Sequence, residues 1–207
     1  MTAHVIYIES DDGPPLTALL QHLRSGRMRL VRQTDLRQAD FDAASGLITT
    51  IYLDQIDFMM RKAALAAFLA AGRRLVFNGH VLHPFVDGLQ PFCKLSSQRR
   101  NDLSLERLSS HPVFEDIPVE AQQTQKGVAG FYGRGHNPPP PDALHLTGIG
   151  PDRLPIDWEW LMPSGGGLFV HSGNDIWGTS DDAGVNALVA TRLVDWALGG
   201  NRMERAA

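Results

Sequence analysis

Short apolar runs alternate with amphipathic stretches along the first half of the chain. Three runs rich in aliphatic, β-branched or aromatic residues end at turn-forming or charged residues, a pattern typical of short strands: 4–9, 28–33 and 47–53. Between the first two runs, four leucines recur at helical spacing: Leu16, Leu19, Leu20 and Leu23. Gly26 then ends the predicted helix. Strands that alternate with helices over short links predict a doubly wound α/β sheet with right-handed crossovers.

The longest helical pattern covers residues 55–71 and runs into Gly72, where we expect the helix to end. Five of its residues share one helical face: Ile56, Met60, Ala63, Ala67 and Ala71. The apolar run 75–77 follows, and the turn 78–80 (Asn-Gly-His) interrupts it before residues 81–84. A short apolar run between a helix and a glycine turn indicates a buried central strand of a parallel sheet.

From residue 87 to residue 163 the pattern loosens, and prolines and glycines punctuate it. Strand-like runs still occur at 103–108, 127–132, 144–150 and 156–161. A run of four prolines follows Asn137 and predicts a rigid loop. This region lacks the apolar content of a second core. We therefore expect one domain over residues 1–207, with a β-rich excursion at 87–163 that extends the sheet in antiparallel fashion.

Regular structure returns near the C-terminus. Three glycines at 165–167 precede a buried strand at 168–171, and a helix with Ser180 or Asp181 as N-cap runs to the glycines at 199–200. We expect residues 201–207 to fray. The predicted fold is flavodoxin-like α/β, with a mostly parallel sheet.

Composition excludes several classes of function. A net charge of -4 and a pI near 6.0 give no sign of a basic surface, so we expect no nucleic-acid partner. Cys93 is the single cysteine, which fits a reducing compartment. The N-terminus lacks a basic signal-peptide segment, and no apolar run reaches the ~20 residues that a membrane span requires. These features predict a cytoplasmic protein without membrane contact.

Three segments together resemble one family. Residues 64–80 (ALAAFLAAGRRLVFNGH) are similar to the run into the nucleophile elbow of the class I glutamine amidotransferase-like superfamily. Residues 111–118 (HPVFEDIP) and 165–177 (GGGLFVHSGNDIW) resemble segments of its ThuA-like, trehalose-utilisation branch. The landmarks occur in the family's order over nearly the whole chain, and the resemblance implies the flavodoxin-like fold.

The departures from the family pattern concern catalysis. Amidotransferases of this superfamily carry a cysteine nucleophile in the elbow and a His-x-Glu pair on a later strand. Here the elbow contains Asn78-Gly79-His80, and the late turn offers Asn174-Asp175. Cys93 lies downstream of the elbow between Phe92 and Lys94, without the base that a nucleophile needs. The sequence therefore does not support glutamine hydrolysis by the family's mechanism.

The elbow supplies the first candidate site. A sharp strand-to-helix turn would expose Asn78 and His80 beside helix N–H groups, with His80 as a general base. His83 could share the ligand or a metal ion with His80. Alternatively, His80 only packs the turn. A metal ion would need a third ligand from another loop, and no histidine pair here has a signature spacing, so we predict neither a metal nor a cofactor.

Further ligand-binding candidates lie at the ends of other predicted strands or in the turns after them: Glu9, Asp11, Arg134, His171, Asn174 and Asp175. Carboxyl ends of parallel strands meet at one sheet edge, where ligands bind. Arg134 lies between two glycines and could contact an anion. The alternative for the acidic residues is a solvated loop.

Two functions remain. In the first, the protein binds or hydrolyses a small polar, carbohydrate-related molecule at the elbow. In the second, it is a catalytically inactive interaction subunit that self-associates as a homo-oligomer.

Overall fold

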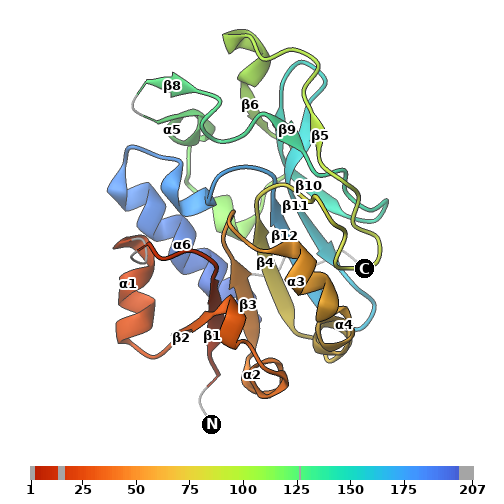
Figure 1. The fold of residues 1–207 in the computed structure, drawn as a ribbon. Helices are drawn as coiled ribbons and strands as arrows, with labels where there is room; N and C mark the ends of the chain where they lie inside the picture. Colours follow the sequence, from red (N-terminus) through yellow and green to blue (C-terminus); the bar gives the residue numbers. More distant parts are fainter. Residues whose placement is uncertain (1–2, 14–16, 126, 201–207) are drawn as a thin grey trace.

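An eight-stranded sheet forms the centre of the protein in a computed structural model that describes residues 3–13, 17–125 and 127–200 (Figure 1). In spatial order its strands are β2 (Met28–Arg32), β1 (Val5–Glu9), β3 (Gly46–Thr49), β4 (Arg74–Asn78), β12 (Gly167–His171), β11 (Leu154–Leu161), β10 (Leu144–Ile149) and β6 (Leu105–Arg107). The first five run parallel, and the last three continue the sheet in antiparallel fashion. The prediction of a mostly parallel α/β sheet is confirmed.

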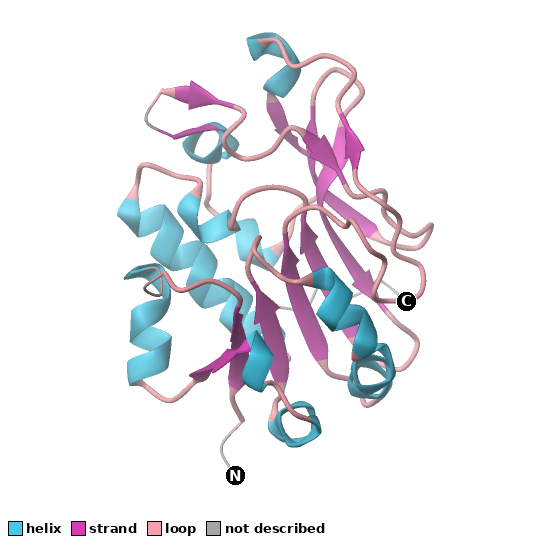
Figure 2. Ribbon diagram, in the orientation of Figure 1, coloured by secondary structure: helices cyan, strands magenta, loops and turns pink. Residues whose placement is uncertain are grey.

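Helices cover both faces of the parallel strands (Figure 2). Packed together on one face are α1 (Thr17–Arg24) and α6 (Ala183–Ala197), and on the other face lie α2 (Gln38–Ala43), α3 (Gln55–Met60) and α4 (Lys62–Ala70). Side chains of β1 alternate between the two sides. Val5 and Tyr7 join the core under α1 and α6, whereas Ile6 and Ile8 join the core under α2 to α4. Burial on both faces explains why the parallel strands form continuous apolar runs.

The helical segment 55–71 differs from its prediction in two ways. It is divided into α3 and α4 at Arg61, whose guanidinium donates to the Leu36 carbonyl and to Asp57. The predicted face is also the solvent side, since Ile56 is 64% and Met60 84% exposed. The buried residues are instead Phe58, Leu65, Phe68 and Leu69.

Side chains fix the starts of two helices. The Asp54 carboxylate accepts hydrogen bonds from the N–H groups of Ile56 and Asp57 and so begins α3. In the same way, Asp182 begins α6, where the sequence pattern predicts Ser180 or Asp181. That prediction is wrong because three adjacent residues offer suitable oxygens, and only the backbone decides between them.

Within residues 87–163, β6, β10 and β11 extend the main sheet. The remaining small elements of this region are the pair β5 (Cys93–Lys94) and β9 (Gly135–His136), the pair β7 (Thr124–Gln125) and β8 (Val128–Ala129), and α5 (Val119–Gln123). The 3-10 helices are η1 (Gln33–Asp35), η2 (Arg100–Leu103), η3 (Pro112–Phe114) and η4 (Ile176–Gly178). Of the predicted strand at 127–132, the structure contains the two residues of β8.

Two sequence predictions fall outside the described residues: the start of the first helix at Leu16 and the frayed tail at 201–207. Of the helices in the described residues, none combines the length and the apolar character that a bilayer span requires.

Candidate functional site

The carboxyl ends of β1, β3 and β12 surround a cavity of about 320 Å³. Its wall comes from segments that are distant in sequence: Tyr7, Glu9, Asp11, Gly13, Thr50, Ile51, Tyr52, Phe131, Asn174, Asp175 and Gly178. In an open α/β sheet this edge is where ligands bind, because loops diverge there and leave a crevice. The cavity is therefore the candidate site.

The structure brings together four of the residues that the sequence proposed. Glu9, Asp11, Asn174 and Asp175 all line the cavity, because β1 and β12 run parallel and end at the same edge. The other five candidates are not part of its wall: Asn78, His80, His83, Arg134 and His171. Asn78 and His171 are fully buried, and the other three are exposed.

Asp175 is the most perturbed carboxyl group of the cavity. Its Oδ1 accepts a hydrogen bond of 2.9 Å from the N–H of Ile51, which ties the end of β12 to the end of β3. Desolvation by burial raises the pKa of Asp175 to about 6, against an ordinary 3.8. The Ile51 bond and the charge of His171 oppose this rise, and the charge of Asp11 adds to it. Asp175 can therefore exchange a proton near neutral pH.

Tyr7 forms part of the wall beside these carboxylates. It is 5% exposed, and its ring packs against that of Trp177 with centroids 6.3 Å apart. Burial, and then the charges of Asp175, Asp11 and Glu9, hold the pKa of the Tyr7 phenol far above its usual range. The hydroxyl therefore stays protonated and can donate as well as accept a hydrogen bond.

Asn78 was expected to be exposed at the elbow, and this expectation is wrong. The residue is completely buried. Its Nδ2 donates to the Thr49 carbonyl at 2.9 Å, and its Oδ1 accepts from the N–H of Ile176 at 3.2 Å. The side chain thus joins β3 to the start of η4 and has no free polar atom to offer a ligand.

The expected strand-to-helix turn after β4 is also absent. Residues 79–92 form an irregular segment without a helix, and Gly79 has φ 113°. A second asparagine determines the path: Asn137 Nδ2 donates to the Gly79 carbonyl, and its Oδ1 accepts from the N–H of Val81. Gln55 holds the next residues, because its Oε1 accepts from the N–H groups of Leu82 and His83. These backbone groups are already bonded, so the helix that would supply an oxyanion site does not form.

His80 projects from this well-held turn. Its ring is exposed on one side and stacks on Phe92 on the other, with centroids 3.6 Å apart and an interplanar angle of 17°. Desolvation on the stacked side, and then repulsion from His171, lower the pKa of His80 below its usual value. The imidazole is therefore neutral at pH 7 and able to accept a proton.

A buried hydrogen-bonded cluster lies at the end of β12. His171 Nδ1 is 2.6 Å from Asp157 Oδ1, and the Tyr132 hydroxyl donates to Asp157 Oδ2 at 2.6 Å. All three residues are almost fully buried. Within the described residues His171 Nε2 has no hydrogen-bond partner. The charge of His171 acts on the cavity, because it opposes the rise in the pKa of Asp175.

The acidic loop after β1 also faces a second cavity, of about 380 Å³, between Glu9, Asp12, Asp54 and Asp57. Arg32 lines this cavity and pairs with Glu9 at 3.6 Å and with Asp12 at 3.3 Å. Arg32 thus partly neutralises Glu9 and Asp12, and the Asp54 carboxylate is used as the cap of α3. Across the described ranges, no three His, Cys, Asp or Glu side chains are grouped to hold a metal ion.

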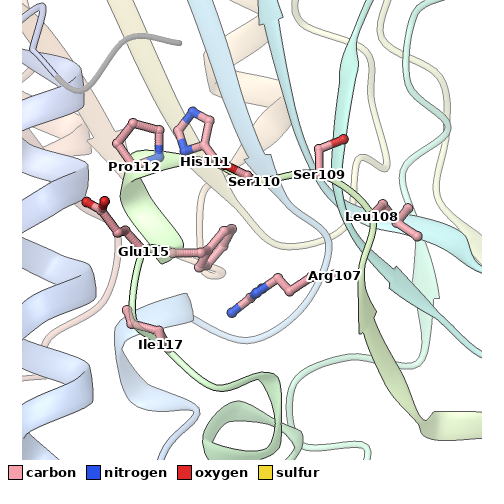
Figure 3. A pocket seen from close by; sticks show the side chains of 9 residues that line it. Arg107, Leu108, Ser109, Ser110, His111, Pro112, Glu115 and Ile117 are labelled. Carbon is pink, nitrogen blue, oxygen red and sulfur yellow. The ribbon is translucent and has the colours of Figure 1, made fainter.

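A third cavity, of about 440 Å³, lies along residues 107–117 (Figure 3). Its best-placed polar group is already engaged in the fold. His111 begins η3, with its Nδ1 accepting from the N–H of Val113, and its Nε2 lies 3.6 Å from buried Glu159. The segment 111–118, which carries part of the family resemblance, therefore packs η3 against α6.

Sequence reasoning missed three residues that organise this edge: Tyr7, Asn137 and Asp157. Asp157 carried no signal, because its partners Tyr132 and His171 are 25 and 14 residues away. Tyr7 carried a weak one, since it is the single hydroxyl-bearing residue in the apolar run 5–8.

Two solved structures resemble the whole chain. The N-terminal domain of mmIFT52 has a TM-score of 0.60 at 13% identity, with 98% of this chain and 100% of that chain covered. A Thermoplasma acidophilum protein described as a putative GMP synthase subunit has a TM-score of 0.61 at 10% identity, with 96% of each chain covered. At such identities the likeness shows the fold alone. No family model and no curated protein matches the sequence.

Proposed function

We propose that this chain is a flavodoxin-like member of the class I glutamine amidotransferase-like superfamily, in its ThuA-like branch, that binds a small polar ligand without amidotransferase chemistry. The parallel strands follow the order 2-1-3-4-5, which is the flavodoxin order. Similarity to a structure described as a GMP synthase subunit supports the superfamily. The end of β4 carries Asn78, Gly79 and His80 where amidotransferases carry cysteine.

The cavity at the carboxyl edge carries the proposal. Polar side chains from β1 and from the loops after β1, β3 and β12 form its wall, and the Tyr7 hydroxyl lies among them without a hydrogen bond within the described residues. Its volume of about 320 Å³ suits a ligand of roughly monosaccharide size. Aromatic rings beside carboxylates are also typical of carbohydrate sites, where rings stack and carboxylates accept from hydroxyl groups.

Binding is the core of the proposal, and we assign no reaction. Asn78 has no free polar atom, and His80 does not line the cavity. If hydrolysis occurs, His80 and Asp175 are the groups whose perturbed pKa values suit proton transfer.

A thermal-shift screen of neutral, cationic and anionic metabolites tests the binding site. A ligand at 100 times its Kd stabilises the protein by about 2.7 kcal/mol, or roughly 5–10 °C for a domain of this size. We expect Tyr7→Phe and Asp175→Asn to reduce the shift and exposed Asp152→Asn to leave it unchanged. If every active metabolite shifts all four proteins equally, the cavity is not the binding site.

The alternative is a catalytically inactive subunit that self-associates. Exposed apolar side chains at and before α3 favour it: Tyr52, Ile56, Met59 and Met60 are between 41% and 84% exposed. Such a surface is typical of protein contacts. Light scattering should then show a dimer that Met60→Glu dissociates and Leu188→Glu, on α6, does not. A monomer at about 100 μM would exclude this alternative.

A further inference from the structure

Besides the hydroxyl groups of Tyr7, Thr50 and Tyr52, the polar side chains of the carboxyl-edge cavity are carboxyl groups and one amide. Glu9, Asp11 and Asp175 contribute three carboxyl groups. Asn174 uses its Nδ2 to donate to the Phe131 carbonyl at 2.8 Å, which leaves its Oδ1 as an acceptor. Among the described residues that form the wall there is no lysine, arginine or histidine. A ligand with hydrogen-bond donors and positive charge would complement this wall.

Tyr7 provides an independent sign that the cavity receives a ligand. The residue is 5% exposed, yet within the described part of the chain its hydroxyl forms no hydrogen bond. The ring is packed, but the hydroxyl is not among the buried atoms without a partner in the described residues, so it is open to the cavity, where a ligand can replace the water bonded to it. Tyr7 lines the same cavity as Glu9, Asp11 and Asp175, so its hydroxyl and these carboxyl groups are available to one ligand.

Neighbouring basic side chains do not neutralise the carboxyl groups of the carboxyl-edge cavity. Arg32 pairs with Glu9 at 3.6 Å, but Arg32 lines the neighbouring cavity and its side chain is 60% exposed. Asp11 and Asp175 form no ion pair with another described residue, and Asp175 receives a single backbone N–H. The cavity is therefore lined by the carboxyl groups of Asp11 and Asp175. The phenol oxygen of Tyr7 and the side-chain amide oxygen of Asn174 lie in the same wall.

We propose that this cavity binds a small organic cation whose ammonium or guanidinium N–H groups donate to Asp11, Asp175 and the Tyr7 hydroxyl. The inference rests on the proposed function, namely that the cavity is the ligand site, and it names the chemical class of the ligand. The aromatic rings of Tyr7, Tyr52 and Phe131 in the wall suit the apolar part of such a ligand and attract its charge.

Isothermal titration at low ionic strength and about pH 7 tests the charge with matched probes. D-glucosamine, D-glucose and D-glucuronate share one ring and differ in charge, and agmatine is a cation without a sugar ring. We expect the two cations to bind at least roughly tenfold more tightly than glucose, and glucuronate not to bind. Choline, a cation without N–H donors, should bind more weakly than agmatine.

Variants then locate the binding. Asp11→Asn should weaken agmatine binding roughly tenfold, and Tyr7→Phe should weaken it without lowering the melting temperature, because it removes an unpaired hydroxyl. The control Asp152→Asn should change neither. Agmatine binding that all variants retain would overturn the inference, and so would choline binding as tight as that of agmatine.

The sugars separate the two proposals. If glucose binds as tightly as glucosamine and Tyr7→Phe weakens both, the cation inference fails and the ligand site stands. If no probe binds in a way that depends on Tyr7 or Asp11, the cation inference fails, and the metabolite screen decides the ligand site separately.

Discussion

Replacing Asp175 by asparagine should change the pH dependence of stability in a defined direction. The folded protein holds the pKa of Asp175 at about 6, whereas the ordinary value is 3.8. As the pH rises between these values, the unfolded chain loses this proton first and is stabilised relative to the folded protein. The contribution of Asp175 to stability is therefore fully present below about pH 4 and is lost as the pH rises through about 6.

The difference between the two pKa values corresponds to about 3 kcal/mol. Solvent reaches Asp175 through the cavity and screens it, so we expect about 1–3 kcal/mol. Asparagine keeps an oxygen that can accept from the N–H of Ile51, now 2.9 Å from Oδ1. The variant therefore removes the titration and leaves the link between β12 and β3 in place.

Urea denaturation at about pH 4, 5, 6 and 7 measures this effect. The free energy of unfolding of Asp175→Asn, relative to the native chain, should rise by about 1–3 kcal/mol from the lowest to the highest pH. Exposed Asp152→Asn should give a flat difference. A flat or falling difference for Asp175→Asn would refute the argument that burial raises its pKa.

Other predictions concern the groups that hold the sheet edge. Tyr132→Phe should lower the free energy of unfolding by about 1.5–3 kcal/mol, since it removes a 2.6 Å bond to buried Asp157, and Tyr52→Phe is the exposed control. Asn137→Ala should cost about 2 kcal/mol or more, because it leaves the Gly79 carbonyl and the Val81 N–H without partners, and faster amide exchange at Val81 should accompany it. A stability change below about 0.5 kcal/mol in either variant would contradict its prediction.

The parallel strands could be predicted because burial on both faces leaves a clear sequence pattern. The runs at 4–9 and 75–77 are apolar without alternation, and each forms a strand with a helix layer on either side. The helical face at 55–71 could not be predicted in the same way. Alanine and methionine occur on both the buried and the exposed face of a helix. The pattern therefore placed Ile56 and Met60 on one face but did not show that this face is exposed.

The position of the acidic residues at one edge of the sheet could be predicted from the strand order. Glu9 is the last residue of β1, and Asp175 follows β12 in the same sheet. Their meeting in one cavity therefore required only the strand order. The burial of Asn78 was unpredictable, because its partners Thr49 and Ile176 are 29 and 98 residues away. Hydrogen bonds between such distant groups leave no local pattern.

Chemical-shift mapping of agmatine binding by NMR at about pH 7 tests the central claim most directly, because it locates the ligand without a mutation. We predict that the largest amide shifts lie at the cavity wall, at Asp11, Ile51, Asn174 and Asp175, and that they saturate together. Shifts confined to the turn around His80, or spread evenly over the acidic surface, would contradict the assignment of this cavity as the ligand site.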